Sequence, residues 1–243
     1  MQLLKIQQKI QKNTSILKIA TSLKLMCMTR LKQLKIQKTS LNQHIKYIQE
    51  KIISREITST GQKKIKKESL TISINIFLFT DMSFCGNFNK KNLYSLQMCQ
   101  KNQDQIYVVG IKGEKFMGSL PKENYMGKLY DKNILNILYN FITNYKEPLK
   151  INLYTYNQME VIYYNNYSGN FYEKCYLKYL LAAHMVDFKY EESRTRLMKV
   201  TTAINNSEVL QNILKLMYNK TRQSIITRDL LEIISGSQIE EEK

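Results

Sequence analysis

Apolar residues recur through the first fifty residues at alternating steps of three and four. Twelve of the fifteen positions in this register are apolar, and a period of about 3.5 residues predicts a long helix with a left-handed coiled-coil seam. No Gly or Pro precedes Gly61, so residues 1–60 are expected to form one coiled-coil helix. The polar members, expected to be weak or register-setting layers, are Asn13, Lys24 and Lys38. The register is Leu3, Ile6, Ile10, Asn13, Leu17, Ala20, Lys24, Cys27, Leu31, Leu34, Lys38, Leu41, Ile45, Ile48 and Ile52.

The C-terminal third carries a second helical pattern. No Gly or Pro interrupts the chain from Tyr172 to Ser235, and Gly236 is expected to end this helix. Apolar residues three, four or seven apart form a stripe at Ala203, Leu210, Ile213 and Met217. A helix of this length cannot bury its stripe alone, so residues 172–236 are expected to pair antiparallel with the first helix.

The middle of the chain, residues 68–165, changes to a strand-rich pattern. Short β-rich apolar runs occur at 71–81, at 106–111 and in "INLYTY" and "VIYY", whereas residues 129–145 have helical spacing. This alternation predicts a small α/β, Rossmann-like domain with a mainly parallel sheet, which gives the whole chain an α+β or α/β class. The first strand is expected to end at Asp81, and Gly61–Lys67 is the expected linker into the domain.

Composition and motifs indicate that the chain has no catalytic site of its own. The segment "GIKGEKFMG" lacks the spacing of a phosphate-binding loop and is interpreted as a strand-end turn. The sequence also lacks a nucleophile elbow, and its four cysteines and two histidines show no metal-ligand spacing. We therefore expect no catalytic residues, no cofactor and no metal. No stretch approaches the ~20 apolar residues that a membrane span requires.

Charge is unevenly distributed along the chain, and this distribution is compatible with several classes of protein. The net charge is +17, and residues 1–67 hold sixteen Lys or Arg against two acidic residues. A basic N-terminus is typical of a mitochondrial transit peptide, but the long apolar register favours mature structure. A basic coiled coil could also bind nucleic acid, and a scaffold or membrane-surface protein is a third possibility.

Three segments, in the same order as in the family, resemble the gamma subunit of the F-type (rotary) ATP synthase. They are "KIATSLKL" at 18–25, "TDMSFCGNFN" at 80–89, and the C-terminal segment from residue 192 to 237. Met82 and Ser83 replace an Arg-Gly pair of the family, the segment 165–175 is shorter than usual, and a chloroplast-type redox cysteine insertion is lacking. The family-motif positions are Lys18, Ile19, Lys24, Asp81, Cys85, Gly86 and Asn89, with Cys85 and Gly86 expected in the turn after the first strand.

The resemblance implies a non-catalytic rotor shaft. In the family, the paired terminal helices stand inside a ring of three alpha and three beta subunits and couple proton-driven rotation of the c-ring to ATP synthesis on the beta subunits. A small epsilon- or delta-type stalk subunit is a further expected partner, whereas nucleic acid and a direct small-molecule substrate are not expected. The implied location is the matrix side of the mitochondrial inner membrane, or the cytoplasmic side of a bacterial plasma membrane.

The resemblance also implies contact residues. Arg222, Gln223 and Thr227 match positions that meet the catch loops of the beta subunits. Arg196, with Arg30 and Lys32 on the opposing helix, is expected to engage acidic beta-subunit residues. The end of the last helix is expected to turn as a bearing tip in a hydrophobic sleeve, because apolar contact is nondirectional. The tip residues are Leu230, Leu231, Ile233 and Ile234.

Overall fold

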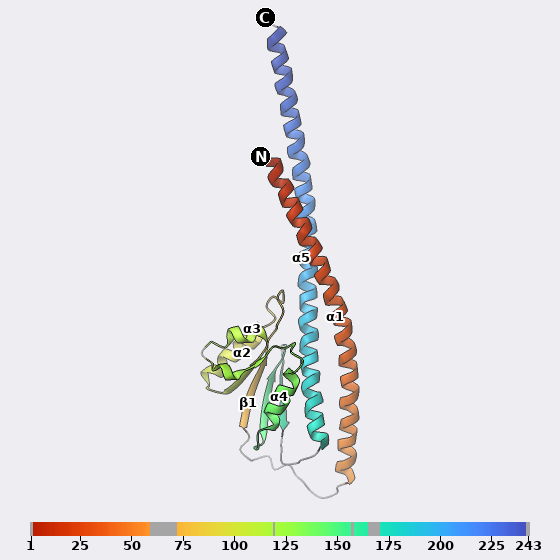
Figure 1. Ribbon diagram of the computed structural model, residues 1–243, viewed down its shortest axis with the longest axis vertical. Coiled ribbons are helices and arrows are strands. Elements are labelled where there is room, and N and C mark those ends of the chain that lie inside the picture. Colours follow the sequence, from red (N-terminus) through yellow and green to blue (C-terminus); the bar gives the residue numbers. More distant parts are fainter. Residues whose placement is uncertain (1, 59–71, 119, 157, 165–170, 242–243) are drawn as a thin grey trace. The chain divides into compact units, whose positions relative to one another are not determined.

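The computed structural model describes residues 2–58, 72–118, 120–156, 158–164 and 171–241 (Figure 1). One compact unit contains residues up to 26 and from 197 onward, and the other contains residues 27–196. The long helices α1 (Gln2–Thr58) and α5 (Phe171–Glu241) contribute to both units and flank a small mixed sheet in the sequence, which confirms the predicted fold class. The other elements are β1 (Ile72–Leu78), α2 (Lys90–Lys101), β2 (Gln105–Val109), α3 (Ile111–Phe116), η1 (Lys122–Asn124), β3 (Tyr125–Gly127), α4 (Ile134–Thr143), β4 (Leu149–Tyr154) and β5 (Met159–Tyr164).

Helix α1 buries the face that its apolar register predicts. Every register position from Leu3 to Ile52 is buried or half-buried, whereas most residues between them are exposed. The polar members of the register fit in different ways. Asn13 is only 6% exposed, and Lys38 forms an ion pair with Asp187 at 3.0 Å.

In the first unit, α5 turns a different face inward from the one that the sequence predicts. The buried positions lie one residue further along the helix, at Ile204 and Leu214. Polar groups complete this face, since the Asn13 amide donates a hydrogen bond to the Ser207 carbonyl oxygen at 2.7 Å and Gln211 is half-buried. These contacts fix the rotation of α5 about its axis and leave the predicted apolar stripe outside. The exposed stripe comprises Ala203, Leu210, Ile213 and Met217.

In the second unit, α1 and α5 run antiparallel. The Lys38 ammonium meets the Asp187 carboxylate, and further along α1 the Gln49 amide donates to the Tyr176 hydroxyl at 3.1 Å. Residue numbers therefore fall along α5 as they rise along α1. The antiparallel pairing expected from the sequence is confirmed here.

The second unit also contains a five-stranded sheet with the order β3-β2-β1-β4-β5. β1 pairs in parallel with both β2 and β4, and β2 pairs in parallel with β3. β5 is antiparallel to β4 and forms one edge. The mainly parallel sheet matches the prediction, although the short strand β3 was not expected.

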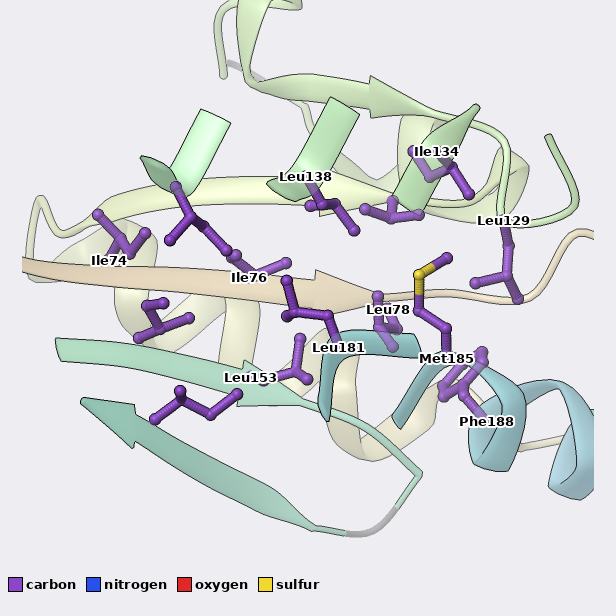
Figure 2. Close-up of a cluster of buried hydrophobic side chains, with 14 of the residues drawn as sticks. Ile74, Ile76, Leu78, Leu129, Ile134, Leu138, Leu153, Leu181, Met185 and Phe188 are labelled. Atoms are coloured by element: carbon purple, nitrogen blue, oxygen red, sulfur yellow. The ribbon is translucent and has the colours of Figure 1, made fainter. Parts of the chain in front are cut away.

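Each face of the sheet has its own apolar core. On one face, β1 packs against α4 and against the first part of α5 (Figure 2). The opposite face carries a smaller cluster of residues, which includes Phe77, Leu96 and Val108 and is covered by α2. The larger core includes Ile74, Ile76, Leu78, Leu129, Ile134, Leu138, Leu153, Leu181, Met185 and Phe188.

Several predicted boundaries need correction. β1 ends at Leu78 and not at Asp81, because Asp81 turns away to bind other loops. α4 begins at Ile134 and not at Leu129, which is a fully buried loop residue. The expected linker at 61–67 lies outside the described residues.

Two glycines behave differently from one another. Gly110 ends β2 with a φ of 104°, and a Cβ there would lie 2.1 Å from the Phe79 carbonyl oxygen, so only glycine fits. The short helix α3 follows directly, so the segment contains more than the expected turn. Gly236, by contrast, does not end α5, which continues to Glu241. One glycine in a helix costs only about 1 kcal/mol relative to Ala, and a long helix absorbs this.

Cys85 should resist alkylation in the folded protein. Its side chain is fully buried, and burial with the nearby Glu192 carboxylate raises the pKa of the thiol to about 11. Thiolate is the reactive form, so at pH 8 iodoacetamide should modify Cys85 about 100-fold or more slowly than an unperturbed thiol. Half-exposed Cys175 is the internal control, and urea should remove the difference. Equal rates in the folded protein would contradict a purely structural role for Cys85.

Candidate partner-binding surface

Near its C-terminal end, α5 exposes several large apolar side chains between residues 226 and 235. Every residue from 226 to 235 is solvent-exposed, in contrast to half-buried Ile225. The side chains of residues 226–235 therefore face solvent within the described part of the chain. Apolar side chains without cover mark a binding surface when they gather at one place. The tip residues Leu230, Leu231, Ile233 and Ile234 are 54%, 60%, 68% and 53% exposed.

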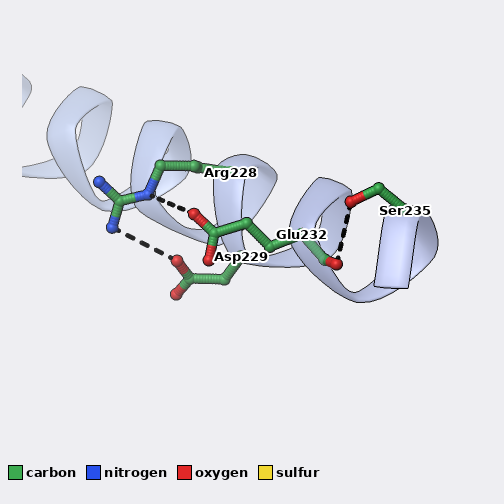
Figure 3. Close-up of polar contacts among 4 residues, drawn as sticks. All are labelled: Arg228, Asp229, Glu232 and Ser235. Atoms are coloured by element: carbon green, nitrogen blue, oxygen red, sulfur yellow. Dashed lines mark hydrogen bonds and ion pairs between the residues drawn. The ribbon is translucent and has the colours of Figure 1, made fainter. Parts of the chain in front are cut away.

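Charged groups near the tip pair along the helix itself. The Arg228 guanidinium lies 3.5 Å from the Asp229 carboxylate and 3.6 Å from that of Glu232 (Figure 3). The Ser235 hydroxyl donates to the Glu232 carbonyl oxygen at 3.1 Å. Exposed pairs of this kind contribute little stability. They do not cover the apolar side chains of the tip, which stay accessible.

The three residues predicted to meet the catch loops, Arg222, Gln223 and Thr227, lie just before this tip. All three are exposed. Arg222 and Gln223 follow half-buried Thr221, so they project from the face of α5 that points away from the seam. The arrangement offers a cation, an amide and a hydroxyl within about one and a half turns of helix.

Arg30 and Arg196 lie together in the second unit. They line an open recess of about 440 Å³ with Lys128, Tyr130 and residues of the loop after β1. The Arg30 guanidinium stacks over the Tyr130 ring at 4.0 Å. The Arg196 guanidinium contacts the Met82 sulfur at 2.8 Å, and its buried Nε has no hydrogen-bond partner among the described residues. Lys32 is exposed on α1 and does not line the recess.

Beside this recess, a buried and a half-buried carboxylate form a hydrogen-bond network. Glu192 is fully buried on α5, and it accepts hydrogen bonds from the Tyr130 hydroxyl at 2.6 Å and the Met82 backbone amide at 2.9 Å. Asp81 accepts from the backbone amides of Ile111 at 2.7 Å and Tyr130 at 3.0 Å. Two acidic side chains therefore tie α5, the loop after β1 and the loop before α4 together.

Burial governs the ionisation of Glu192 and Tyr130. It raises the pKa of Glu192, and the hydrogen bonds from Tyr130 and Met82 oppose that rise. Burial together with the Glu192 charge raises the pKa of Tyr130, so the phenol stays protonated and donates its hydrogen bond.

The motif residues at 80–89 shape the loop after β1. Asn89 donates to the Thr80 hydroxyl at 2.8 Å and accepts from the Thr80 backbone amide at 3.3 Å. Cys85 is buried in the turn before α2, and Gly86 has a φ of 56°. On α1, Lys18 and Ile19 are exposed and Lys24 is half-buried. The loop motif therefore supports the fold locally.

The sequence did not point to Tyr130 or to the pairing of Glu192 with it. Tyr130 lies in "GKLYDKN", which matches no motif and contains one of seventeen tyrosines in the chain. Its role depends on contacts with residues more than sixty positions away. Within the described residues, no group of three His, Cys, Asp or Glu side chains could hold a metal ion, and no helix there is long and apolar enough for a membrane span.

Curated ATP synthase gamma chains are similar to this chain over nearly its whole length. The gamma chain of Buchnera aphidicola subsp. Melaphis rhois is 24% identical over an alignment 283 positions long, which covers 96% of each chain. The gamma chain of Malacoplasma penetrans is 26% identical over 96% of this chain and 97% of the relative. That of Blochmanniella pennsylvanica is 50% identical over 48 residues, which cover 20% of this chain. No protein-family model matches the chain.

Solved structures share the fold. A chain in the Euglena gracilis mitochondrial ATP synthase (OSCP/F1/c-ring) matches with a TM-score of 0.64 and 13% identity, over 98% of this chain and 94% of that one. A chain in the rotor of the same synthase matches with a TM-score of 0.62 over 93% of this chain. The full-length similarity in sequence and the shared fold confirm the resemblance that the motifs indicate: this chain is similar to ATP synthase gamma chains over nearly its whole length.

Proposed function

We propose that the protein is the central rotor shaft of an F-type ATP synthase. The observation that carries this proposal is the similarity to gamma chains over 96% of both chains. The protein then performs no chemistry itself: ATP forms on the beta subunits, and the shaft couples their conformations to rotation of the c-ring. Such coupling needs only that different angles of the shaft favour different subunit conformations.

The proposed partners are three alpha and three beta subunits, a small epsilon- or delta-type stalk subunit and the c-ring. The exposed end of α5 suits a rotating contact, because Leu230, Leu231, Ile233 and Ile234 present apolar surface. Apolar surface gains free energy from burial without requiring fixed bond directions. A hydrophobic sleeve formed by the alpha and beta subunits is the proposed socket.

Polar residues before the tip are proposed to hold the shaft at defined angles. Arg222, Gln223 and Thr227 are exposed and can donate hydrogen bonds to the catch loops of the beta subunits. Arg30 and Arg196 are proposed to meet acidic beta-subunit residues, with Lys32 as an accessory cation. The recess that Arg30 and Arg196 share gives an incoming carboxylate two guanidinium groups.

A role in binding nucleic acid is not proposed. The gamma-chain relatives lend it no support. In the rotor function, the basic residues of α1 would instead face acidic surfaces of the surrounding subunits. The protein is a peripheral subunit of the F1 part. We propose the matrix side of the mitochondrial inner membrane as its location, with the cytoplasmic face of a bacterial plasma membrane as the alternative.

Purification of the native complex tests the proposed function. The tagged full-length protein, isolated from its own cells under mild conditions, should bring down alpha and beta subunits at three copies each. Quantitative mass spectrometry measures the ratio, and organelle fractionation of the same cells decides between the two locations. Recovery of nucleic-acid-binding partners without alpha and beta subunits would reject the proposal.

A further inference from the structure

Tyr130 contacts both long helices and the sheet domain within the second unit. Its ring lies under the Arg30 guanidinium of α1 at 4.0 Å and under the Lys189 ammonium of α5 at 5.1 Å. Its hydroxyl donates to the Glu192 carboxylate of α5 at 2.6 Å. Its backbone amide donates to Asp81, in the loop after β1. One side chain with its amide therefore joins three parts of the unit.

The acceptor on α5 is set up for this bond. Glu192 is fully buried, and its second oxygen accepts from the Met82 backbone amide at 2.9 Å. Burying a carboxylate costs free energy unless hydrogen bonds compensate it. The bonds from Tyr130 and Met82 provide this compensation for Glu192. Hydrogen bonds to a charged acceptor are short and directional.

Much of the remaining contact between α5 and the sheet domain is apolar, beside a cation-π contact of Lys178 with the Tyr139 ring at 5.5 Å and the contact of Arg196 with the Met82 sulfur. Leu177, Leu181, Met185 and Phe188 pack into the larger core. Such packing holds the helix on the sheet strongly, but it sets no single bond direction. The hydrogen bonds of Tyr130 and Glu192 add directional contacts to this packing, and the Tyr130 ring extends them to α1 through Arg30.

We propose that Tyr130, held by Glu192, is a positioning residue that locks the sheet domain to both helices so that torque passes between them. The inference rests on the proposed rotor function and adds to it a joint through Tyr130, which lies outside the family motifs. Loss of the joint leaves ATP hydrolysis at the beta subunits possible, but lets the sheet domain slip relative to the helices. Coupling, and not catalysis, is then the property that suffers.

The test is Tyr130→Phe in the assembled synthase, reconstituted in membrane vesicles. This change removes the hydroxyl that binds Glu192 and keeps the ring under Arg30. The readout is ATP-driven proton pumping per ATP hydrolysed. We expect normal subunit content, little change in hydrolysis, and a several-fold fall in the ratio. Tyr107→Phe is the matched control, because it removes a phenol whose hydrogen bond lies within the sheet domain, to Tyr145 at 3.3 Å, and should leave the ratio unchanged.

Glu192→Gln supplies a second measurement on the same joint. A neutral amide weakens the bond from Tyr130 while it nearly preserves the volume of the side chain, so the ratio should fall again. An unchanged ratio in both variants would overturn the proposal, and so would an equal fall in Tyr107→Phe. Failure of both variants to assemble, while Tyr107→Phe assembles, would also overturn it, since the joint would then serve folding. If the wild-type protein does not join a synthase, the proposed function fails instead.

Discussion

Replacing Leu34 with aspartate should prevent the protein from joining a stable complex. Leu34 is 6% exposed on the seam face of α1, and the change places an unpaired carboxylate in that packed seam. Burying a charge without a partner costs several kcal/mol, which is a large part of the ~5–15 kcal/mol that stabilises a typical domain. The expected result is loss of the cooperative thermal transition and loss of the chain from the purified complex.

Ile36→Asp is the matched control for this substitution. Ile36 lies two residues away on the same helix and is 69% exposed, so the same chemical change meets water instead of the seam. Its thermal midpoint and its incorporation should stay close to those of the wild-type protein. Equal behaviour of the two variants would mean that the seam of α1 does not hold the fold together.

Removal of the polar side chains before the tip should cut ATP synthesis while leaving assembly intact. Hydrogen bonds from Arg222 and Gln223 to acidic or carbonyl partners contribute ~1.5 to 3 kcal/mol each when a charge takes part. Loss of one such bond in the rate-determining angular state corresponds to a roughly 10- to 150-fold slower rate. Arg222→Ala and Gln223→Ala should each approach this loss in proton-driven ATP synthesis, measured on complexes of verified subunit content.

Two controls separate the proposed role of Arg222 and Gln223 in holding the shaft at defined angles from the role of the apolar tip as a bearing. Lys215→Ala removes an exposed cation from the same helix and should leave synthesis unchanged. A chain truncated after Ser224 lacks the apolar tip but keeps Arg222 and Gln223, so it should retain weakened rotation in the normal direction. If Arg222→Ala and Gln223→Ala were both silent, the assignment of gripping residues would be wrong.

Sequence patterns predicted α1 far better than α5, and the cause is chemical. The seam face of α1 is apolar at twelve of fifteen positions, so periodicity alone identifies it. The inward face of α5 in the first unit includes Ser207 and Gln211, whose role depends on hydrogen bonds to the partner helix. A more apolar but exposed stripe at Leu210 and Ile213 therefore misled the prediction. A seam with polar residues can therefore be identified only from a structure that contains both helices.

The candidate site likewise contains residues that the sequence could predict and residues that it could not. Exposed residues such as Gln223 could be proposed from the family motif, because the motif is local in sequence. The network around Glu192 could not, since Tyr130 and Met82 approach it from loops distant in sequence. The segment that carries Tyr130 has no periodicity that would single it out. Tyr130 is one of seventeen tyrosines, and nothing in the sequence distinguishes it from the others.

Rotation of the chain itself tests the rotor function most directly. Tyr94 on α2 is 61% exposed and contributes to neither apolar core, so Tyr94→Cys combined with Cys175→Ser provides an attachment point for a bead on the sheet domain. With the alpha and beta subunits fixed to glass, ATP should drive the bead in one direction, with three equal pauses in each turn. A bead that only fluctuates, on complexes that hydrolyse ATP and retain the labelled chain, would contradict the function of this protein as the rotor.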